Sequence, residues 1–262
     1  REKLAEDPNL SIQDNFAYSA PQNPALSKST APSSASSSST SSGGKQVVIA
    51  LIDTPVQPLG NNSKLLPSIQ LAGDPGKLPA DPTHGTAMAS VIWEQFPDAI
   101  IRPIDIYGTS GTTTSWDVAN GIIAAMNSTP RPDIINISSG GAGGNELGDI
   151  ASRNAAGQGM LLFAAAGNSG TDQPIFPAAY PSFIAVTAAH NGVLESYANY
   201  GSFVRLANEG SYYFQYMGDN YISRGTSPAS AATSGAAAGL LSQGMTPAQT
   251  ISALSQKLSV QK

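Results

Sequence analysis

Residues 225–241 contain almost only small side chains, and this run constrains the fold more than any other stretch of the chain. It begins with Gly225-Thr226-Ser227 and continues through repeated Ala, Ser and Gly. Such residues predict a helix that packs closely against a sheet. The first N–H groups of a helix lack partners within it and carry a partial positive charge. Ser227 is therefore a candidate nucleophile, although Gly-Thr-Ser is also typical of a simple helix N-cap.

A second candidate follows a continuous apolar run at residues 47–52. Val-Val-Ile-Ala-Leu-Ile is typical of a parallel strand that is buried on both faces. Asp53 comes directly after it, at the strand end where open α/β sheets place their functional sites. Asp53 is thus a candidate catalytic carboxylate. The alternative is that it caps a turn ahead of Pro55.

The chain has two histidines, and only His84 stands in an informative context. Gly85, Thr86 and a series of small and apolar residues follow it, which predicts a buried helix with the imidazole at its start. Imidazole is the usual general base because its pKa lies near neutrality. A histidine that only caps a helix is the alternative. His190 lies in a predicted turn, and we assign it no role.

Residues 160–165 form another apolar run, which leads into Ala166-Gly167-Asn168. The side-chain amide of Asn168 on this glycine-flanked turn is a candidate donor to a developing oxyanion. The alternative is a turn asparagine in the left-handed conformation.

The pattern of strands and helices along the chain predicts an α/β fold. Buried strands are expected at 47–52, 100–106, 133–138, 160–165 and 183–187, and helices at 84–95, 115–127, 146–158, 226–243 and 246–258.

In this order and context, the Asp, His, Asn and Ser residues resemble the subtilisin-like serine proteases, or subtilases, whose triad follows the chain order Asp, His, Ser. The resemblance covers about residues 45–258 and rests on Ile52-Asp53-Thr54, His84-Gly85-Thr86, Ala165-Ala166-Gly167-Asn168 and Gly225-Thr226-Ser227-x-Ala229. Three residues depart from the family pattern. Pro55 stands where Gly is usual, Pro228 where Met is usual, and Ala231 where Pro is usual.

The resemblance implies a three-layer fold, with a mostly parallel central sheet and helices on both faces. It also implies a serine endopeptidase with Ser227 as nucleophile, His84 as base, Asp53 as its orienting carboxylate and Asn168 in the oxyanion hole. The implied substrate-binding residues are Ser138, Ser139, Gly140, Gly141, Ala165, Ala166 and Gly167. Two alternatives stay open: a peptide transferase (macrocyclase) on the same fold, and a catalytically silent binding module.

The family's strong calcium site depends on a long loop after the histidine helix. Here residues 93–99 lead almost directly into the next predicted strand, so we expect no strong calcium site and no other cofactor. The resemblance implies protein or peptide substrates, an intramolecular propeptide inhibitor and a secreted location.

Composition excludes several other classes. The net charge of −5 without a Lys/Arg cluster argues against nucleic-acid binding. No apolar run reaches the roughly 18–20 residues that span a bilayer. The chain has no cysteine, so a thiol nucleophile and disulfides are excluded.

The first 44 residues differ in composition from the predicted catalytic domain at 45–262. Residues 27–44 are rich in Ser and predict a flexible linker. Residues 1–26 fit either the tail of a propeptide from a longer precursor or an ordinary N-terminal arm. As a propeptide tail, residues 15–18 would form a strand along the edge at 138–140. Tyr18 would then fill the substrate pocket, and the Tyr18–Ser19 bond would be a self-cleavage site.

Overall fold

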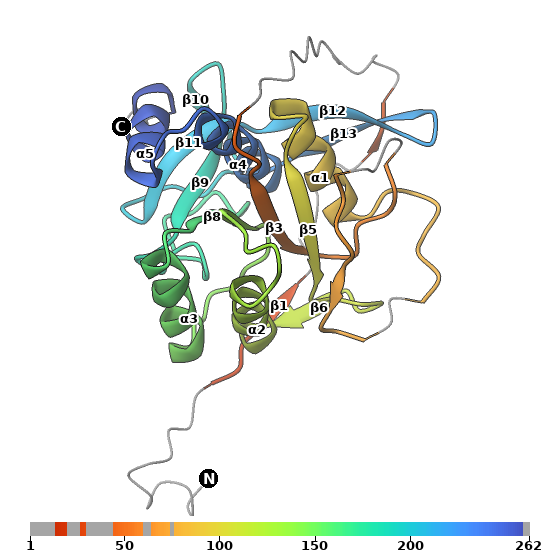
Figure 1. Ribbon diagram of the computed structural model, residues 1–262, viewed down its shortest axis with the longest axis horizontal. Coiled ribbons are helices and arrows are strands. Elements are labelled where there is room, and N and C mark those ends of the chain that lie inside the picture. Colours follow the sequence, from red (N-terminus) through yellow and green to blue (C-terminus); the bar gives the residue numbers. More distant parts are fainter. Residues whose placement is uncertain (1–13, 20–26, 30–43, 60–63, 74–75, 259–262) are drawn as a thin grey trace, which may run out of the picture.

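Parallel strands joined by helices build a central eight-stranded sheet in the computed structural model of this protein (Figure 1). The structure describes residues 14–19, 27–29, 44–59, 64–73 and 76–258. The sheet order is β10-β9-β8-β7-β3-β5-β4, with β11 paired to β9. Its strands are β3 (Val48–Asp53), β4 (Ile69–Gln70), β5 (Ile100–Asp105), β7 (Ile134–Ile137), β8 (Leu161–Ala165), β9 (Ile184–His190), β10 (Val193–Leu194) and β11 (Val204–Glu209). Only β10 runs antiparallel to its neighbour.

Every predicted helix and buried strand is present, with shifts only at the ends. The helices are α1 (His84–Gln95), α2 (Ser115–Met126), α3 (Glu146–Gly157), α4 (Thr226–Ser242) and α5 (Pro247–Lys257). The predicted turn at His190 is wrong, because β9 extends to that residue. The turn follows it, at Asn191 and Gly192, where φ is 51° and 81°.

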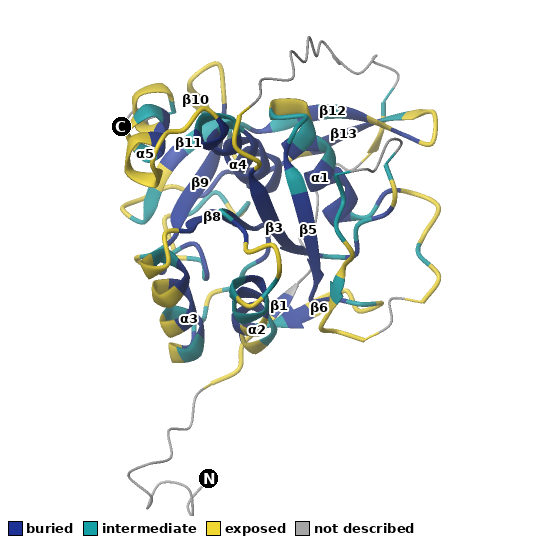
Figure 2. Cartoon of the chain, in the orientation of Figure 1, coloured by how far each residue is buried: buried dark blue, intermediate teal, exposed yellow. Residues whose placement is uncertain are grey.

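Alternate residues of β3 belong to two different hydrophobic clusters. Ile49 and Leu51 pack with residues of α1 and α4, whereas Ala50 and Ile52 pack with residues of α2 and α3. Since neighbouring strand residues point to opposite faces, the sheet is covered on both sides. This confirms the predicted three-layer fold, and the middle strands are its most buried part (Figure 2).

The small residues of α4 are explained by its close approach to α1. A Cβ added at Gly235 would lie 2.7 Å from the backbone oxygen of Ile92 and from Cβ of Gln95. A side chain at that position would push the two helices apart. The two helices thus pack side by side on the same face of the sheet, and most residues of α4 are buried.

A hairpin that sequence analysis missed precedes α4. Strands β12 (Ser211–Tyr216) and β13 (Asp219–Arg224) pair antiparallel around Met217 and Gly218, which have φ of 49° and 90°. Two left-handed residues in succession are typical of the tight turn of a hairpin. A short strand, β2 (Ser27–Lys28), adds to β13. The start of the predicted linker is therefore paired with the domain, and residues 30–43 lie outside the described residues.

The segment before the linker is also paired, but not where we predicted. Strand β1 (Ala17–Ser19) runs antiparallel to β6 (Thr112–Thr114), with Tyr18 opposite Thr113. The predicted edge at 138–140 continues into Gly141, whose N–H and C=O groups already exchange hydrogen bonds with Phe176. Strand β1 pairs instead with the backbone N–H and C=O groups at the edge of β6.

Side chains of the same segment lie against a glycine-rich loop. Tyr18 is 1% exposed, and its hydroxyl donates to the carbonyl oxygen of Gly143 at 2.6 Å. A Cβ on Gly141 would lie 2.4 Å from the Tyr18 ring, and one on Gly143 would lie 2.2 Å from the Phe16 ring. The Tyr18 and Phe16 rings therefore fit against this loop only because positions 141 and 143 are glycine.

No helix within the described ranges has both the length and the apolar character needed to cross a membrane.

Candidate active site

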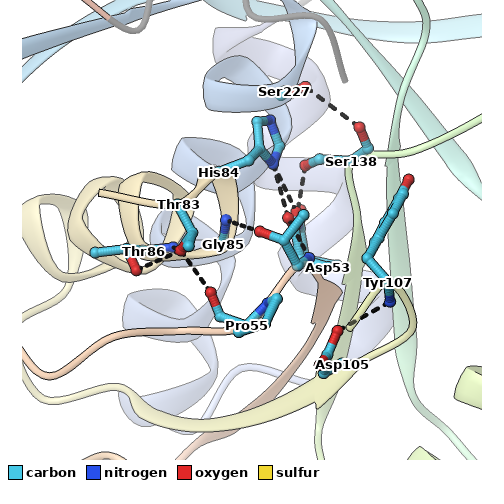
Figure 3. Close-up of polar contacts among 12 residues, drawn as sticks. Asp53, Pro55, Thr83, His84, Gly85, Thr86, Asp105, Tyr107, Ser138 and Ser227 are labelled. Atoms are coloured by element: carbon cyan, nitrogen blue, oxygen red, sulfur yellow. Dashed lines mark hydrogen bonds and ion pairs between the residues drawn. The ribbon is translucent and has the colours of Figure 1, made fainter. Parts of the chain in front are cut away.

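Two of the predicted side chains meet where β3 ends and α1 begins (Figure 3). Nδ1 of His84 lies 2.8 Å from Oδ1 and 2.9 Å from Oδ2 of Asp53. The two side chains are 7% and 1% exposed. An N–H group directed at both oxygens of a carboxylate fixes the orientation of the imidazole ring. It also leaves Nε2 as the nitrogen that can accept a proton.

Ser227 lies on the other side of the imidazole from Asp53 (Figure 3). Its hydroxyl donates to the carbonyl oxygen of Ser138 at 3.3 Å, and the residue is 2% exposed. Nε2 of His84 is buried and has no hydrogen-bond partner within the described residues. The structure therefore brings Asp53, His84 and Ser227 together, with the serine hydroxyl turned towards Ser138.

The local sequence explains how Ser227 reaches this position. Gly225 has φ of 134°, in the region that favours glycine, and it turns the chain from β13 into α4. Ser227 is the second residue of the helix, and Pro228 is the third. A proline in the first turn removes no intrahelical hydrogen bond, so this departure from the family pattern fits the helix start.

Asn168 lies in the loop between β8 and β9 and faces the same helix start. Its Oδ1 accepts hydrogen bonds from the N–H of Thr226 at 2.8 Å and from the Thr226 hydroxyl at 3.0 Å. Because the amide oxygen is bound in this way, the side chain has Nδ2 left as a donor, and Nδ2 has no hydrogen-bond partner within the described ranges. Nδ2 is also the atom nearest to a Cβ placed on Gly225, at 3.1 Å.

Gln57 is a buried residue of this region that sequence analysis missed; it is 3% exposed. Its side-chain oxygen accepts from the Thr83 N–H at 2.7 Å and from the Thr86 hydroxyl at 3.1 Å. Its NH₂ group donates to the carbonyl oxygens of Pro79 at 2.8 Å and Asp81 at 3.3 Å. Thr83 is the N-cap of α1, so Gln57 holds the helix turn that carries His84.

The predicted substrate-binding residues follow two adjacent strands. Strands β7 and β8 pair in parallel with Ile137 opposite Ala164, so Ser138 and Ala165 begin neighbouring segments at one edge of the sheet. Ser138, Ser139, Ala165 and Ala166 are buried. Gly167 is held by a hydrogen bond from its N–H to the Thr226 hydroxyl at 3.1 Å. Gly140 packs against Ile175 and Phe176, and Gly141 faces Tyr18.

A second buried carboxylate lies beside the Asp53–His84 pair. Asp105 ends β5 and is in register with Asp53 on β3. Burial raises the pKa of Asp105, and the charge of Asp53 raises it further. Hydrogen bonds from the N–H groups of Tyr107 and Gly108 act in the opposite direction. Burial also raises the pKa of the Tyr107 hydroxyl.

The remaining predictions concern His190 and metal ions. His190 lies at the end of β9, where its exposed Nδ1 is 2.8 Å from Oε1 of Glu209. Glu209 raises the pKa of His190 through this hydrogen bond and through its charge.

The described part of the chain contains no group of three or more His, Cys, Asp or Glu side chains that could hold a metal ion.

A serine, a histidine and a carboxylate brought together in this way are typical of the serine hydrolases, whatever their fold. The model of one family, described as the subtilase family, matches residues 44–260. The chain therefore belongs to the subtilase family, and the resemblance noted in the sequence is confirmed.

Several proteases are similar to this chain in sequence. Thermitase of Thermoactinomyces vulgaris is 38% identical over 151 residues, which cover 56% of this chain and 53% of thermitase. A thermostable alkaline protease of Halalkalibacterium halodurans is 30% identical over 190 residues, or 66% of this chain and 52% of that protein. The chain thus spans about half the length of these two relatives.

Solved structures agree with the family assignment. The self-cleaved protease domain of PatA has a TM-score of 0.68 and 28% identity, over 81% of this chain and 89% of that one. A cold-adapted subtilisin-like serine proteinase has a TM-score of 0.65 and 29% identity, over 79% and 80% of the two chains. A lanthipeptide protease, 21% identical with a TM-score of 0.69 over 80% and 79%, shares the fold.

Proposed function

We propose that this protein is a serine endopeptidase that cleaves peptide bonds through an acyl-enzyme. The observation that carries the proposal is the geometry at His84. Its Nδ1 is bound by both oxygens of Asp53, and its buried Nε2 is unpartnered within the described residues, on the side of Ser227. Rotation of the Ser227 hydroxyl away from Ser138 would direct it to Nε2. Catalytic hydrogen bonds are often incomplete until a substrate binds.

In the proposed reaction, Ser227 Oγ attacks the carbonyl carbon of the scissile bond, and its proton passes to Nε2 of His84. Asp53 orients the ring and stabilises the imidazolium that forms. The oxyanion is bound by Nδ2 of Asn168 and by the backbone N–H of Ser227. As the C–N bond breaks, His84 gives the proton to the leaving amine. Water then attacks the ester in the same way and releases the acid, and the proton returns to Ser227.

The test of the assignment is peptide hydrolysis by Ser227→Ala and His84→Ala. Each should lower turnover by several orders of magnitude, because the three residues act as a unit. The alternatives give different results. A peptide transferase would transfer the acyl group to an added amine in preference to water, whereas a silent binding module would show no Ser227-dependent turnover of any peptide.

A second proposal concerns the amino-terminal segment, which we infer to be an intramolecular inhibitor. Its support is the pairing of β1 with β6 and the burial of Tyr18 against Gly141, one of the predicted substrate-binding residues. Addition of a strand is a common way to bind an extended peptide, with backbone pairing for affinity and alternate side chains in pockets. A segment bound in this way would exclude a substrate from the part of the predicted pocket that Gly141 forms.

Tyr18→Ala tests this inhibitor role in the uncleaved chain. The initial rate on a soluble peptide should rise, because the strand loses its buried anchor. Lys28→Ala is the control, since it removes only an exposed ion pair with Asp219. Sequencing of the mature amino terminus locates the processing site. An end at Ser19 supports cleavage after Tyr18, and an end between residues 27 and 45 moves the site into the linker. A stable end at Arg1 in the fully active enzyme contradicts the propeptide proposal.

We propose an extracellular location on the basis of family membership and of one further relative. The minor extracellular protease Epr of Bacillus subtilis is 28% identical over 79% of this chain and 33% of its own length. A secreted fraction that contains the Ser227-dependent activity is the expected result, and activity confined to the cell interior would contradict it.

A further inference from the structure

Asn199 is a fully buried polar residue that belongs to no helix or strand and to none of the predicted site residues. Its side chain binds the loop around Asn168 at three points. Nδ2 donates to the carbonyl oxygen of Ala166 at 3.0 Å. Oδ1 accepts from the N–H groups of Ser169 at 2.9 Å and Thr171 at 3.3 Å. The amide therefore holds the loop both before and after Asn168.

The backbone near Asn199 strengthens this attachment. The Asn199 N–H donates to the carbonyl oxygen of Gly167 at 2.9 Å, and the Gly170 N–H donates to that of Tyr197 at 2.7 Å. The carbonyl oxygen of Asn199 accepts from the Thr187 hydroxyl at 2.5 Å, and Thr187 belongs to β9. Asn199 is thus fixed to the sheet, and the loop at 166–171 is fixed to Asn199.

Gly167 shows how closely the loop and the amide approach each other. Its φ is 105°, and an added Cβ would lie 2.5 Å from Nδ2 of Asn199. The direction of Asn168 depends on this backbone path and on the two bonds between its Oδ1 and Thr226. Displacement of the loop would weaken those bonds and would leave Nδ2 of Asn168 free to turn away from Ser227.

We infer that Asn199 is a positioning residue that holds the Asn168 amide towards the oxyanion formed at Ser227; the inference rests on the proposed function. Asparagine suits this position because one side chain must both donate and accept. Aspartate keeps both acceptor contacts but has no donor for the Ala166 carbonyl. Leucine, of similar size, loses all three hydrogen bonds.

A double-mutant cycle between Asn168 and Asn199 tests the inference. Asn168→Ala should lower kcat by about 10²–10³-fold, the usual loss for one oxyanion-hole donor. Asn199→Leu should lower kcat by about 10–10²-fold, since small misplacements of catalytic groups reach this size. Asn199→Asp should have a smaller effect. The double variant should be no slower than Asn168→Ala alone, because a misplaced amide and a missing one are equivalent.

Two further readouts separate positioning from a general loss of structure. KM should change little in the Asn199 variants, while the affinity for a peptide boronic acid, whose tetrahedral adduct mimics the oxyanion, should fall in parallel with kcat. Arg102→Leu is the matched control. Arg102 is 8% exposed and also donates to two loop carbonyl oxygens, those of Pro67 and Thr129. This variant should lose stability without a change in kcat.

The outcomes distinguish the inference from the proposed function. A normal kcat in Asn168→Ala would overturn the oxyanion role of that residue and this inference with it, while the roles of Ser227 and His84 would stand. If Asn168→Ala lowers kcat and the loss of kcat in the double variant equals the product of the two single losses, only the inference about Asn199 is overturned. The inference would also be overturned if Arg102→Leu lowered kcat as much as Asn199→Leu does at the same loss of stability. If Asn199→Leu does not fold, the double-mutant cycle with Asn168→Ala is measured with Asn199→Asp instead.

Discussion

The side-chain oxygen of Gln57 accepts a hydrogen bond from the N–H of Thr83, the residue that immediately precedes His84, at 2.7 Å. The loop after β3 and the first turn of α1 are thus joined by one buried amide. Since β3 ends in Asp53 and α1 begins with His84, this contact, together with the hydrogen bond from the Gly85 N–H to the Thr54 hydroxyl, holds the proposed catalytic pair in place.

We predict that Gln57→Leu lowers kcat by about 10–10²-fold with little change in KM, because the imidazole loses its fixed position relative to Asp53 and Ser227. Trp93→Phe is the control. It removes a hydrogen bond at the other end of the same helix, from Nε1 of Trp93 to the carbonyl oxygen of Ala99 at 2.8 Å. Equal losses of kcat in both variants would mean that Gln57 stabilises α1 without positioning His84.

The roles of Gln57 and Asn199 could not be predicted from the sequence, unlike those of the other site residues. Asp53, His84, Asn168 and Ser227 each follow or begin a predicted element, so the sequence places them at strand ends or helix starts. Gln57 and Asn199 lie in irregular segments, and their partners are mostly backbone groups, which no residue pattern identifies. Their roles appear only when the fold brings distant segments together.

The β12–β13 hairpin was also absent from the sequence-based prediction, but for a different reason. Strand β12 has aromatic residues at alternate positions, Tyr212, Phe214 and Tyr216, and the turn at Met217 and Gly218 precedes a second strand of equal length. Alternation of this kind before a two-residue turn that contains Gly is typical of a β-hairpin. The pairing of β2 with β13 had no such signal, because Ser27 and Lys28 are held through their backbone and through the exposed Lys28–Asp219 ion pair.

Substrate specificity provides a second prediction. The proposed pocket walls, Ser138 to Gly141 and Ala165 to Gly167, carry small uncharged side chains. They should accept a large apolar or aromatic side chain before the scissile bond, because burial of such a side chain contributes about 1.5–3 kcal/mol. A peptide-library profile is the measurement. Dominance of Arg or Lys at that position would contradict the assignment of the pocket.

Metal removal provides a third prediction. We expect that treatment with a chelator leaves the melting temperature almost unchanged, because α1 and β5 are joined by only residues 96–99 and no long calcium-binding loop intervenes. A tightly bound ion would add RT ln(1 + [L]/Kd) to the free energy of unfolding, which is several kcal/mol at saturating metal. A large fall in melting temperature on chelation would show that an ion site exists.

The fourth prediction concerns Asp105. Burial raises the pKa of this carboxyl in the folded state, so its contribution to stability is largest at low pH and is lost as the pH rises through the folded-state pKa. Asp105→Asn should therefore raise the melting temperature at neutral pH, and the gain should shrink as the pH falls towards 3.8, the unperturbed value. Asp172→Asn, at an exposed position, is the control for the loss of one charge. A gain that does not depend on pH would contradict this explanation.

The most direct test of the central claim is covalent labelling of Ser227 by a peptidyl phosphonate, with the modified residue identified by mass spectrometry. A phosphonate reacts rapidly only with a serine whose proton is accepted by a neighbouring base. We predict one labelled residue, Ser227, with loss of labelling in Ser227→Ala and strongly slowed labelling in His84→Ala. Labelling of another residue, or peptide hydrolysis by Ser227→Ala at a near-normal rate, would contradict the role of Ser227 as nucleophile.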